Sequence, residues 1–445
     1  MLRHKNKDMK DKSSIDNSLR ESWFTCLSAG LFFFYVFFQM NIFDVINQSL
    51  RQAFQINAAQ LSWMSSTFVW ASILFFIPAG IIVDRFSVRK IILITMIICI
   101  TGTLGFALAK SYILASIFHS FTGVANAFCF LSCIVLVYRF FPPTHQALVT
   151  GCLVTMAFCG GMAAHTPLAY INEYVGWRTA LLIDGIFGLF ILIWLFFVIR
   201  DKIQPESSRN NALTWLKGIT QVLTTKQNWF AGIYTACLNF PIMVLCALWG
   251  ASYLKKVHHL GNIEASNIMS LILMGSMIGG PLFGLVSDKL GRRKPVMFFG
   301  AIGSLSTMVL LVMFSDLSFT ALSCLFFMIG LFSSSQIIGY PLISESNHSN
   351  NTGFATAIAS IIITGSGGLA QVLFGALLQH HAGFKAHHFV SLDFQYAIIM
   401  LPIAAAISCL TILGINETYC SRSFMKELYE EKKQINSFTH EPNYT

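Results

Sequence analysis

Two histidines, His119 and His165, lie in the outer halves of long apolar runs of the sequence. An ionisable group inside a hydrophobic span is costly, and an imidazole titrates near neutral pH, so each histidine could carry a proton. A neutral, hydrogen-bonded structural histidine is the alternative at both positions, because no carboxylate lies deep in any run. Asp44 and Asp184 fall close to the predicted outer surface, where we expect solvated side chains that extend to water. An extracellular gate is the alternative at Asp44.

Neutral polar residues on the same runs could bind a solute. Amides and hydroxyls suit a small polar or zwitterionic molecule, because they supply hydrogen bonds without a net charge. A hydrogen bond between helices is the alternative for each residue taken alone, and we favour it for Gln371 and Ser333. The residues predicted to bind substrate are Tyr35, Gln39, Asn126, Asn239 and Gln336.

One pattern of glycine, aspartate and basic residues occurs twice. Glycine lets a neighbouring helix approach closely, and the aspartate four positions later lies on the same helical face at the water boundary. There it can face the positive N-terminus of an adjacent helix, while the basic residues hold the loop in the cytoplasm. The repetition indicates two similar halves. The copies are Gly80, Asp84, Arg85 and Arg89, and then Gly284, Asp288, Lys289, Gly291, Arg292 and Arg293.

The composition excludes several classes of protein. With 55% hydrophobic and 11% charged residues among 445, the chain is too apolar for a soluble protein. The net charge is +9, but the basic residues fall in short gaps between apolar runs rather than on one face of a soluble domain, so nucleic-acid binding is not expected. The eleven cysteines lack metal or redox spacing, so no metal or cofactor is expected. No nucleophile–base set or phosphate loop is present, so we do not expect an enzyme.

The apolar runs predict an all-α integral membrane protein with twelve transmembrane helices in two pseudo-symmetric six-helix bundles. We expect a tail at 1–22, bundles at 23–199 and 229–416, a linker at 200–228 and a second tail at 417–445. The predicted spans are 23–47, 61–83, 90–109, 112–138, 147–172, 178–199, 229–253, 263–286, 295–314, 318–343, 352–379 and 394–415.

The distribution of Lys and Arg predicts the orientation. Of 29 such residues, only six fall in the loops opposite the N-terminus, namely Arg51, Lys110, Arg178, Lys255, Lys256 and Lys385. Basic residues concentrate on the cytoplasmic side, so both termini are predicted to be cytoplasmic. The compact loops favour a bacterial inner membrane.

In its number of spans, its central linker and both motif copies, the sequence resembles the major facilitator superfamily of secondary transporters. Three short sequence segments support the resemblance. They begin at Arg139 after span 4, at Gly176 before span 6 and at Asn416 after span 12. The resemblance implies two halves that rock around a central site lined by spans 1, 4, 7 and 10.

The resemblance also implies roles for the motif residues. Asp84 should approach the start of span 11 at residues 351–353, and Asp288 the start of span 5 at residues 144–146. Glu345, at the end of span 10, is the expected acidic partner of Arg292 or Arg293.

Two departures from the family pattern bear on the substrate. Drug antiporters resemble one another in a span-5 glycine pattern that ends in Gly-Pro. This chain keeps the earlier glycines, Gly151 and Gly160, but has Ala164 and His165 in place of the final Gly-Pro. An efflux pump is therefore less favoured. Spans 1 and 7 contain no Arg, so phosphate-bearing substrates would lack their usual electrostatic clamp.

These observations together predict a permease that moves a small organic solute by alternating access, coupled to protons. We expect it to act as a monomer in contact with membrane lipid. The alternatives are a multidrug or metabolite efflux antiporter and, less favoured, a transporter-like solute sensor.

The orientation can be tested with topology reporters. A reporter fused after Thr445 should report the cytoplasm, and one inserted in the loop at 50–60 should report the outer side, because of the bias in basic residues. Paired reporters active on opposite sides of the membrane would measure this. A C-terminus on the outer side would contradict both the orientation and the even number of spans.

Overall fold

The computed structural model describes residues 2–141, 143–200, 223–314, 316–347, 352–383 and 389–420. Within these ranges the side chains at 2–20, 84–85, 138, 143–147 and 352–357 are not described. Helices and short connections make up all of the described chain, so the all-α prediction is confirmed. The predicted linker and second tail lie largely outside the described residues.

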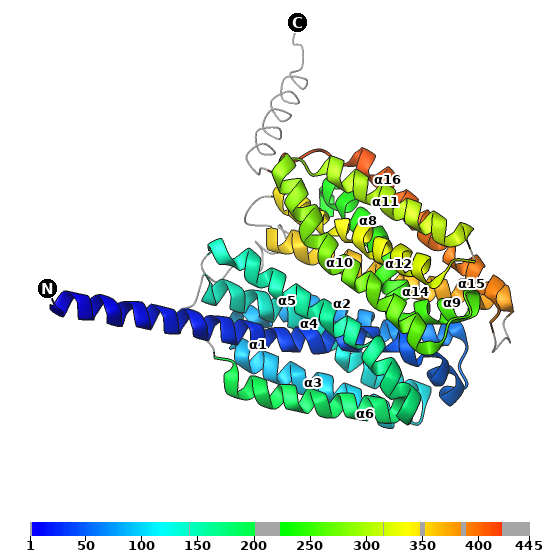
Figure 1. Cartoon of the computed structure of the whole chain (residues 1–445), viewed down its shortest axis with the longest axis horizontal. Coiled ribbons are helices and arrows are strands. Elements are labelled where there is room, and N and C mark those ends of the chain that lie inside the picture. Colours follow the sequence, from blue (N-terminus) through cyan, green and yellow to red (C-terminus); the bar gives the residue numbers. More distant parts are fainter. Residues whose placement is uncertain are drawn as a thin grey trace, which may run out of the picture. The chain divides into compact units, whose positions relative to one another are not determined.

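The helices follow one another along the chain (Figure 1). They are α1 (Leu2–Phe54), α2 (Ala58–Arg85), α3 (Val88–Leu108), α4 (Tyr112–Phe140), α5 (Pro143–Ala163), α6 (Thr166–Val198), α8 (Lys226–Pro241), η1 (Ile242–Trp249), α9 (Gly250–Val257), α10 (Asn262–Leu290), α11 (Lys294–Met313), α12 (Phe319–Ser333), η2 (Ser334–Ile338), α13 (Gly339–Glu345), α14 (Thr352–Ala382), α15 (Ser391–Ile398) and α16 (Met400–Gly414).

Eleven helical stretches among the described residues are long and apolar enough to cross a membrane. One of them, Leu148–Val198, has 51 residues, or about 76 Å of helix against a hydrocarbon core of about 30 Å. The backbone reverses inside it at Gly176, whose φ of 77° and ψ of 161° are not helical. The chain then returns so that α6 packs along α3 (Figure 1). This stretch therefore holds the two crossings predicted as spans 5 and 6.

The chain forms two compact units, and each is described by itself. Unit 1 comprises Met1–Ser207, Met243–Met274 and Gly368–Ala397. Unit 2 comprises Ser208–Ile242, Gly275–Gly367 and Ile398–Thr445. Parts of the seventh, eighth and eleventh predicted spans thus belong to the same compact unit as the first six spans.

Helix α1 occupies the centre of unit 1, packed against α3, α4, α5 and α6. Its buried residues include Phe32, Tyr35 and Val36, which join one continuous apolar cluster. Glycines on the surrounding helices allow backbone-to-backbone contact. A Cβ built at Gly160 of α5 would collide with the carbonyl of Phe34, so the two helices can approach this closely only with glycine there.

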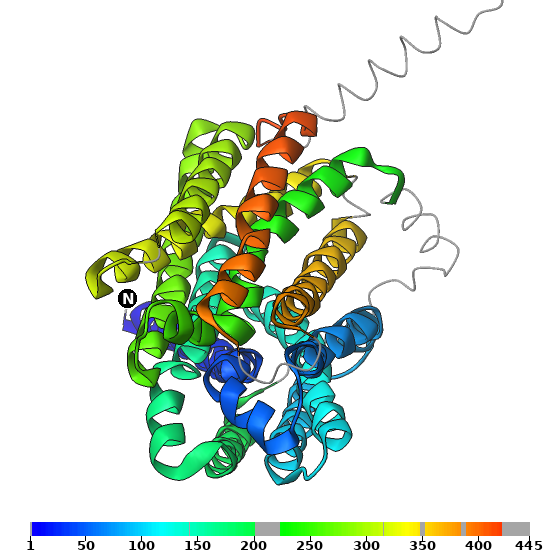
Figure 2. The same cartoon turned by 90° about the vertical axis from the view of Figure 1, so that its right-hand side faces the viewer.

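Unit 2 is built around α8, which contacts α16, α13 and η2. Figure 2 shows the orange-red α16 beside the green α8. Tyr234 of α8 is fully buried, and its hydroxyl donates to the carbonyl of Met297 over 3.0 Å. Since an unpaired hydroxyl is costly away from water, this bond fixes α8 against α11.

The seventh predicted span changes its helical winding along its length. Helix α8 ends at Pro241, which has no N–H and whose ring clashes with the preceding turn. The next eight residues, Ile242–Trp249, form a π-helix, and α9 then begins at Gly250. Changes in winding leave backbone groups without their usual partners within the helix. Groups from other helices must bond them in a membrane interior.

The helix packing in unit 1 gives a prediction about two glycines of α5. Gly160→Ala should destabilise the protein by about 1–3 kcal/mol, because the new Cβ forces α1 and α5 apart. Gly151→Ala on the same helix is the matched control, since no described atom lies within 4 Å of a Cβ there. Thermal unfolding of the detergent-purified proteins measures the difference. Equal melting temperatures for the two variants would contradict the packing.

Candidate functional site

A buried acid–histidine pair lies inside unit 1. The Oδ2 atom of Asp44, on α1, lies 3.5 Å from Nδ1 of His165, and neither side chain is exposed to solvent. His165 occupies the break between α5 and α6, just before Thr166 and Pro167 start the next helix. The other carboxylate oxygen, Oδ1, accepts the backbone N–H of Ala251 over 2.8 Å. The pair therefore links α1, the α5–α6 break and α9.

The expectation of solvated side chains at Asp44 and Asp184 is wrong. Asp44 is 0% and Asp184 5% exposed. For Asp44 the reason is the irregular seventh span. The backbone N–H of Ala251, just after the π-helix, needs an acceptor in the membrane interior, and this carboxylate accepts it. For Asp184 the reason is Gln39, whose Nε2 donates to Oδ2 over 2.6 Å inside the bundle.

Further side chains of unit 1 bond residues of the π-helix, two of them at its backbone. Asn47, one turn beyond Asp44 on α1, donates from Nδ2 to the carbonyl of Leu248 over 2.7 Å. Gln371 of α14 donates from Nε2 to the carbonyl of Met243 over 2.8 Å. The indole N–H of Trp249 donates to the hydroxyl of Ser62 on α2 over 3.2 Å. Side chains of α1, α2 and α14 thus hold one short helical segment.

Neighbouring polar contacts extend this arrangement. Gln379 accepts the N–H of Ala58 at the start of α2 over 3.0 Å. Thr166 donates to Asn267 of α10 over 2.8 Å. Within unit 1, the predicted outer ends of α1, α2 and α6 are therefore bonded to the outer parts of spans 7, 8 and 11. We call the residues Asp44, Asn47, Ser62, His165 and Gln371 the outer cluster.

His119 has different surroundings. Its ring packs against Phe43, Phe68 and Phe106, with centroids 4.5, 5.8 and 5.8 Å away. Thr122 Oγ1 lies 3.4 Å from His119 Nδ1. Within the described part of the chain, no acid is recorded in contact with this imidazole.

The structure brings two predicted substrate residues together around Asp184. Besides the bond from Gln39, the hydroxyl of Tyr35 donates to the backbone carbonyl of Asp184 over 3.3 Å. Tyr35 and Gln39 are both 0% exposed. Their polar groups therefore connect α1 to α6 in this conformation.

The other predicted substrate residues are distributed over both units. Asn126 of α4 is part-buried in unit 1 and donates to the hydroxyl of Ser72 over 3.1 Å. Asn239, in unit 2, is 7% exposed near the end of α8. Gln336 is part-buried in η2, and its backbone carbonyl accepts from Thr235 over 3.2 Å.

The second motif copy forms an ionic network in unit 2. Arg293 donates to Glu345 over 2.7 Å and to Asp288 over 2.6 Å. Burial disfavours the charge on Arg293, but its bonds to Glu345 and Asp288 outweigh burial, so the pKa of the guanidinium is raised. The predicted partnership with Glu345 is present, and Thr418 donates to the same carboxylate. Gly291 has a φ of 61°, which favours glycine at the turn.

The first motif copy is organised differently. Arg89 donates to the carbonyl of Phe196 on α6 over 2.7 Å. The side chains of Asp84 and Arg85 lie outside the described residues, as do those predicted to face Asp84 and Asp288. No described atom lies within 4 Å of a Cβ built at Gly80 or Gly284, so the close helix contact expected there is not found.

The comparisons with known proteins decide the family. The family model described as Major Facilitator Superfamily matches residues 27–266 and 244–419. The chain belongs to the Major Facilitator Superfamily. This confirms the resemblance found in the sequence and makes the chain a multi-pass membrane transporter.

Curated members of the superfamily match at low identity. The probable galactarate/D-glucarate transporter GudP of Bacillus subtilis is 22% identical over 56% of this chain and 61% of its own length, less than two thirds. The probable sulfoacetate transporter SauU of Cupriavidus necator is 21% identical over 77% of this chain and 84% of its own length.

Solved structures of superfamily members support the fold. A bacterial homolog of the human lysosomal transporter Spinster, inward-facing and unoccupied, has a TM-score of 0.72 at 16% identity, covering 88% of this chain and 97% of that one. A D-xylose-proton symporter has a TM-score of 0.70 at 15% identity, covering 89% and 98%.

The sequence predictions missed two members of the outer cluster, Asn47 and Ser62, and the backbone amide that Asp44 bonds. Asn47 and Ser62 resemble ordinary polar residues near helix ends, and an interior backbone amide such as that of Ala251 has no sequence signature. Pro241 in the middle of an apolar run was the available signal, because proline interrupts helical hydrogen bonding.

The ionic network of this superfamily member gives a prediction about two acids. Glu345→Gln should cost about 3 kcal/mol or more, because the Arg293 and Glu345 side chains are only 8% and 11% exposed. Asp288→Asn should cost at most about 1 kcal/mol, because Asp288 is 65% exposed. Melting temperatures in detergent compare the two. A larger loss for Asp288→Asn would refute this ranking.

Proposed function

We propose that this chain is a proton-coupled permease that imports a small organic solute by alternating access. The observation that supports this most directly is the Asp44–His165 pair, buried within unit 1 and bonded to the N–H of Ala251. Buried ionisable groups within a membrane are costly and mark proton pathways in many transporters. The pair also touches the irregular span on which the outer cluster converges.

One proton can be shared by the pair. It makes either an imidazolium beside a carboxylate or a neutral acid beside a neutral imidazole, and neither form adds a net charge to the pair. Loss of that proton leaves a carboxylate beside a neutral imidazole, so the buried pair then carries a net negative charge. Lys255 on α9 also attracts Asp44, but its ammonium bonds Asn262 at the exposed end of the helix.

The proton occupancy of the pair then controls the outer cluster. A buried unpaired charge costs several kcal/mol, and hydration relieves this cost. A pair that has lost its shared proton therefore favours separation of α1 from α9, which admits water from the outer side. A protonated pair favours the packed arrangement described in unit 1. This difference shifts the conformational equilibrium, as coupling requires.

His165, rather than His119, is the proposed proton carrier. The aromatic rings around His119 favour a neutral imidazole, because no acid among its described contacts compensates a positive charge buried among Phe43, Phe68 and Phe106. We assign His119 a packing role, the alternative that the sequence left open.

The proposed substrate is a small polar or zwitterionic solute. Asn126, Asn239 and Gln336 are the hydrogen-bonding residues that we assign to it, while Tyr35 and Gln39 position α6 in this conformation. An organic acid is the second candidate substrate. The relatives favour it, since they are named as transporters of galactarate/D-glucarate, of sulfoacetate and, in Acinetobacter baylyi, of cis,cis-muconate.

Two other functions remain as alternatives to import. Efflux is less favoured, because His165 stands where the drug-antiporter pattern places proline. A solute sensor has one supporting relative, the membrane sensor protein UhpC of Escherichia coli, 25% identical over 57% of this chain. We propose a bacterial inner membrane location with cytoplasmic termini, and a monomeric transporter rather than an enzyme.

Transport by reconstituted variants tests the coupling. In proteoliposomes with a pH gradient, a labelled panel of polar solutes and organic acids should identify a substrate that accumulates. His165→Gln and Asp44→Asn should abolish this accumulation but retain exchange across equal pH, since binding does not need the proton site.

His119→Gln is the matched control, a buried imidazole changed in the same way, and should retain gradient-driven accumulation. Undiminished accumulation in both His165→Gln and Asp44→Asn would remove the pair as the proton carrier. Solute binding without transport by the unaltered protein would favour the sensor instead.

A further inference from the structure

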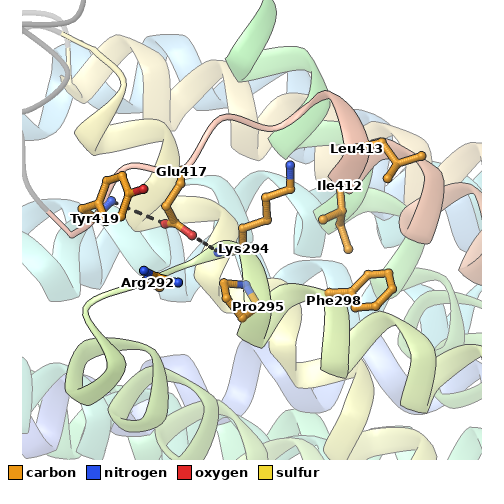
Figure 3. A pocket seen from close by; sticks show the side chains of 8 residues that line it. All are labelled: Arg292, Lys294, Pro295, Phe298, Ile412, Leu413, Glu417 and Tyr419. Carbon is orange, nitrogen blue, oxygen red and sulfur yellow. Dashed lines mark hydrogen bonds between the residues drawn. The ribbon is translucent and has the colours of Figure 1, made fainter.

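A pocket lies on unit 2 where α11 begins and α16 ends. Its volume is about 420 Å³. Figure 3 shows the side chains that surround it. Two are basic, one is acidic and the others are largely apolar. The lining residues are Arg292, Lys294, Pro295, Phe298, Ile412, Leu413, Glu417 and Tyr419.

The polar and apolar side chains are separated. In Figure 3, Arg292, Glu417 and Tyr419 lie toward one end, and Phe298, Ile412 and Leu413 toward the other, with Lys294 between them. The apolar end is accessible, since Phe298 is 44% and Leu413 72% exposed. Phe298 lies one turn deeper in α11 than Lys294, so the basic end is at the predicted cytoplasmic boundary and the apolar end faces the hydrocarbon.

The acid in the pocket is hydrogen-bonded to the start of a helix. The two oxygens of Glu417 accept the N–H groups of Arg293 and Lys294 over 2.7 and 3.0 Å. This carboxylate thereby caps the positive N-terminus of α11. The pocket therefore holds two basic side chains against one acid, whose oxygens are bonded to the helix.

The basic residues of the motif have separate environments. Arg293 turns into the bundle toward Glu345, while Arg292 is exposed and lies over the ring of Tyr419 at 5.8 Å. Lys294 donates to the carbonyl of Ile415 over 2.9 Å, which uses one of the three donors of its ammonium. Arg292 and Lys294 therefore each retain N–H donors at the pocket.

We propose that this pocket binds an anionic phospholipid of the cytoplasmic leaflet. The headgroup phosphate lies between Arg292 and Lys294, and an acyl chain lies along Phe298 and Leu413. Positive charge next to a lipid-facing apolar surface matches this molecule, and basic pockets between helices at the cytoplasmic side bind acidic headgroups. The inference rests on the predicted orientation and is independent of proton coupling.

Lipid titration of the delipidated full-length protein tests the proposal. Native mass spectrometry should show tighter binding of phosphatidylglycerol than of phosphatidylcholine with the same acyl chains. Arg292→Gln and Lys294→Gln should each weaken phosphatidylglycerol binding about fivefold, because each removes a basic group near the membrane surface. Leu413→Asn should also weaken it, since it makes the apolar end polar.

Lys90→Gln is the matched control. Lys90 corresponds to Lys294 in the first motif copy, where the counterpart of Arg292 is the buried Val88. This variant should bind phosphatidylglycerol like the unaltered protein. The melting temperature of each variant, measured in the same samples, distinguishes a loss of lipid binding from misfolding.

Three outcomes would overturn the proposal. Equal weakening by Lys90→Gln would show that binding depends on overall charge rather than on this pocket. Glycerophosphate binding as tight as that of the lipid would make the pocket a site for soluble phosphate anions. Unchanged phosphatidylglycerol binding in Arg292→Gln, a variant that leaves the Lys294–Ile415 bond intact, would exclude the pocket.

Discussion

The bond from the Ala251 N–H to Asp44 reflects the constraint on which the described structure most depends. A backbone group inside a membrane must have a hydrogen-bond partner, because neither water nor lipid supplies one. Where Ile242–Trp249 winds as a π-helix, part of this requirement passes to side chains of α1 and α14. An irregular turn in one helix thereby determines where two other helices place their polar residues.

The same constraint explains why the buried acids of unit 1 behave unlike surface acids. Asp44 bonds a backbone amide and lies beside His165, and Asp184 bonds Gln39. In both cases the partner comes from a helix distant in sequence. A carboxylate that is a liability in hydrocarbon becomes a specific contact between helices, and a contact that can gain or lose a proton is suited to coupling.

The two motif copies show how similar sequences acquire different structures. Gly291 adopts a left-handed conformation, whereas Ser87 at the equivalent position has a φ of −61° and caps α3 through its hydroxyl. Glu345 draws Arg293 into unit 2, whereas Arg89 bonds the end of α6. The ionic network described here thus belongs to the second copy, and the pocket beside it depends on Arg292, which the first copy lacks.

Much of the fold followed from the sequence, since spans of apolar residues and the placement of Lys and Arg are local properties that the bilayer enforces. Helical class, span positions and family could be predicted for this reason, and the family resemblance implied that Glu345 would pair with Arg292 or Arg293. The sequence also predicted a separate crossing on each side of Gly176, because the apolar runs 147–172 and 178–199 are each long enough to span the membrane.

The partners of individual polar residues could not be predicted in the same way. Asp44 and Asp184 were expected to reach water, because sequence gives their depth but not which helix covers them. Whether His119 or His165 lies beside an acid depends on packing between segments more than 40 residues apart. The sequence by itself determined which residues lie in the membrane. Only the tertiary structure decided which of them meet, because burial and hydrogen-bond partners arise from contacts between distant segments.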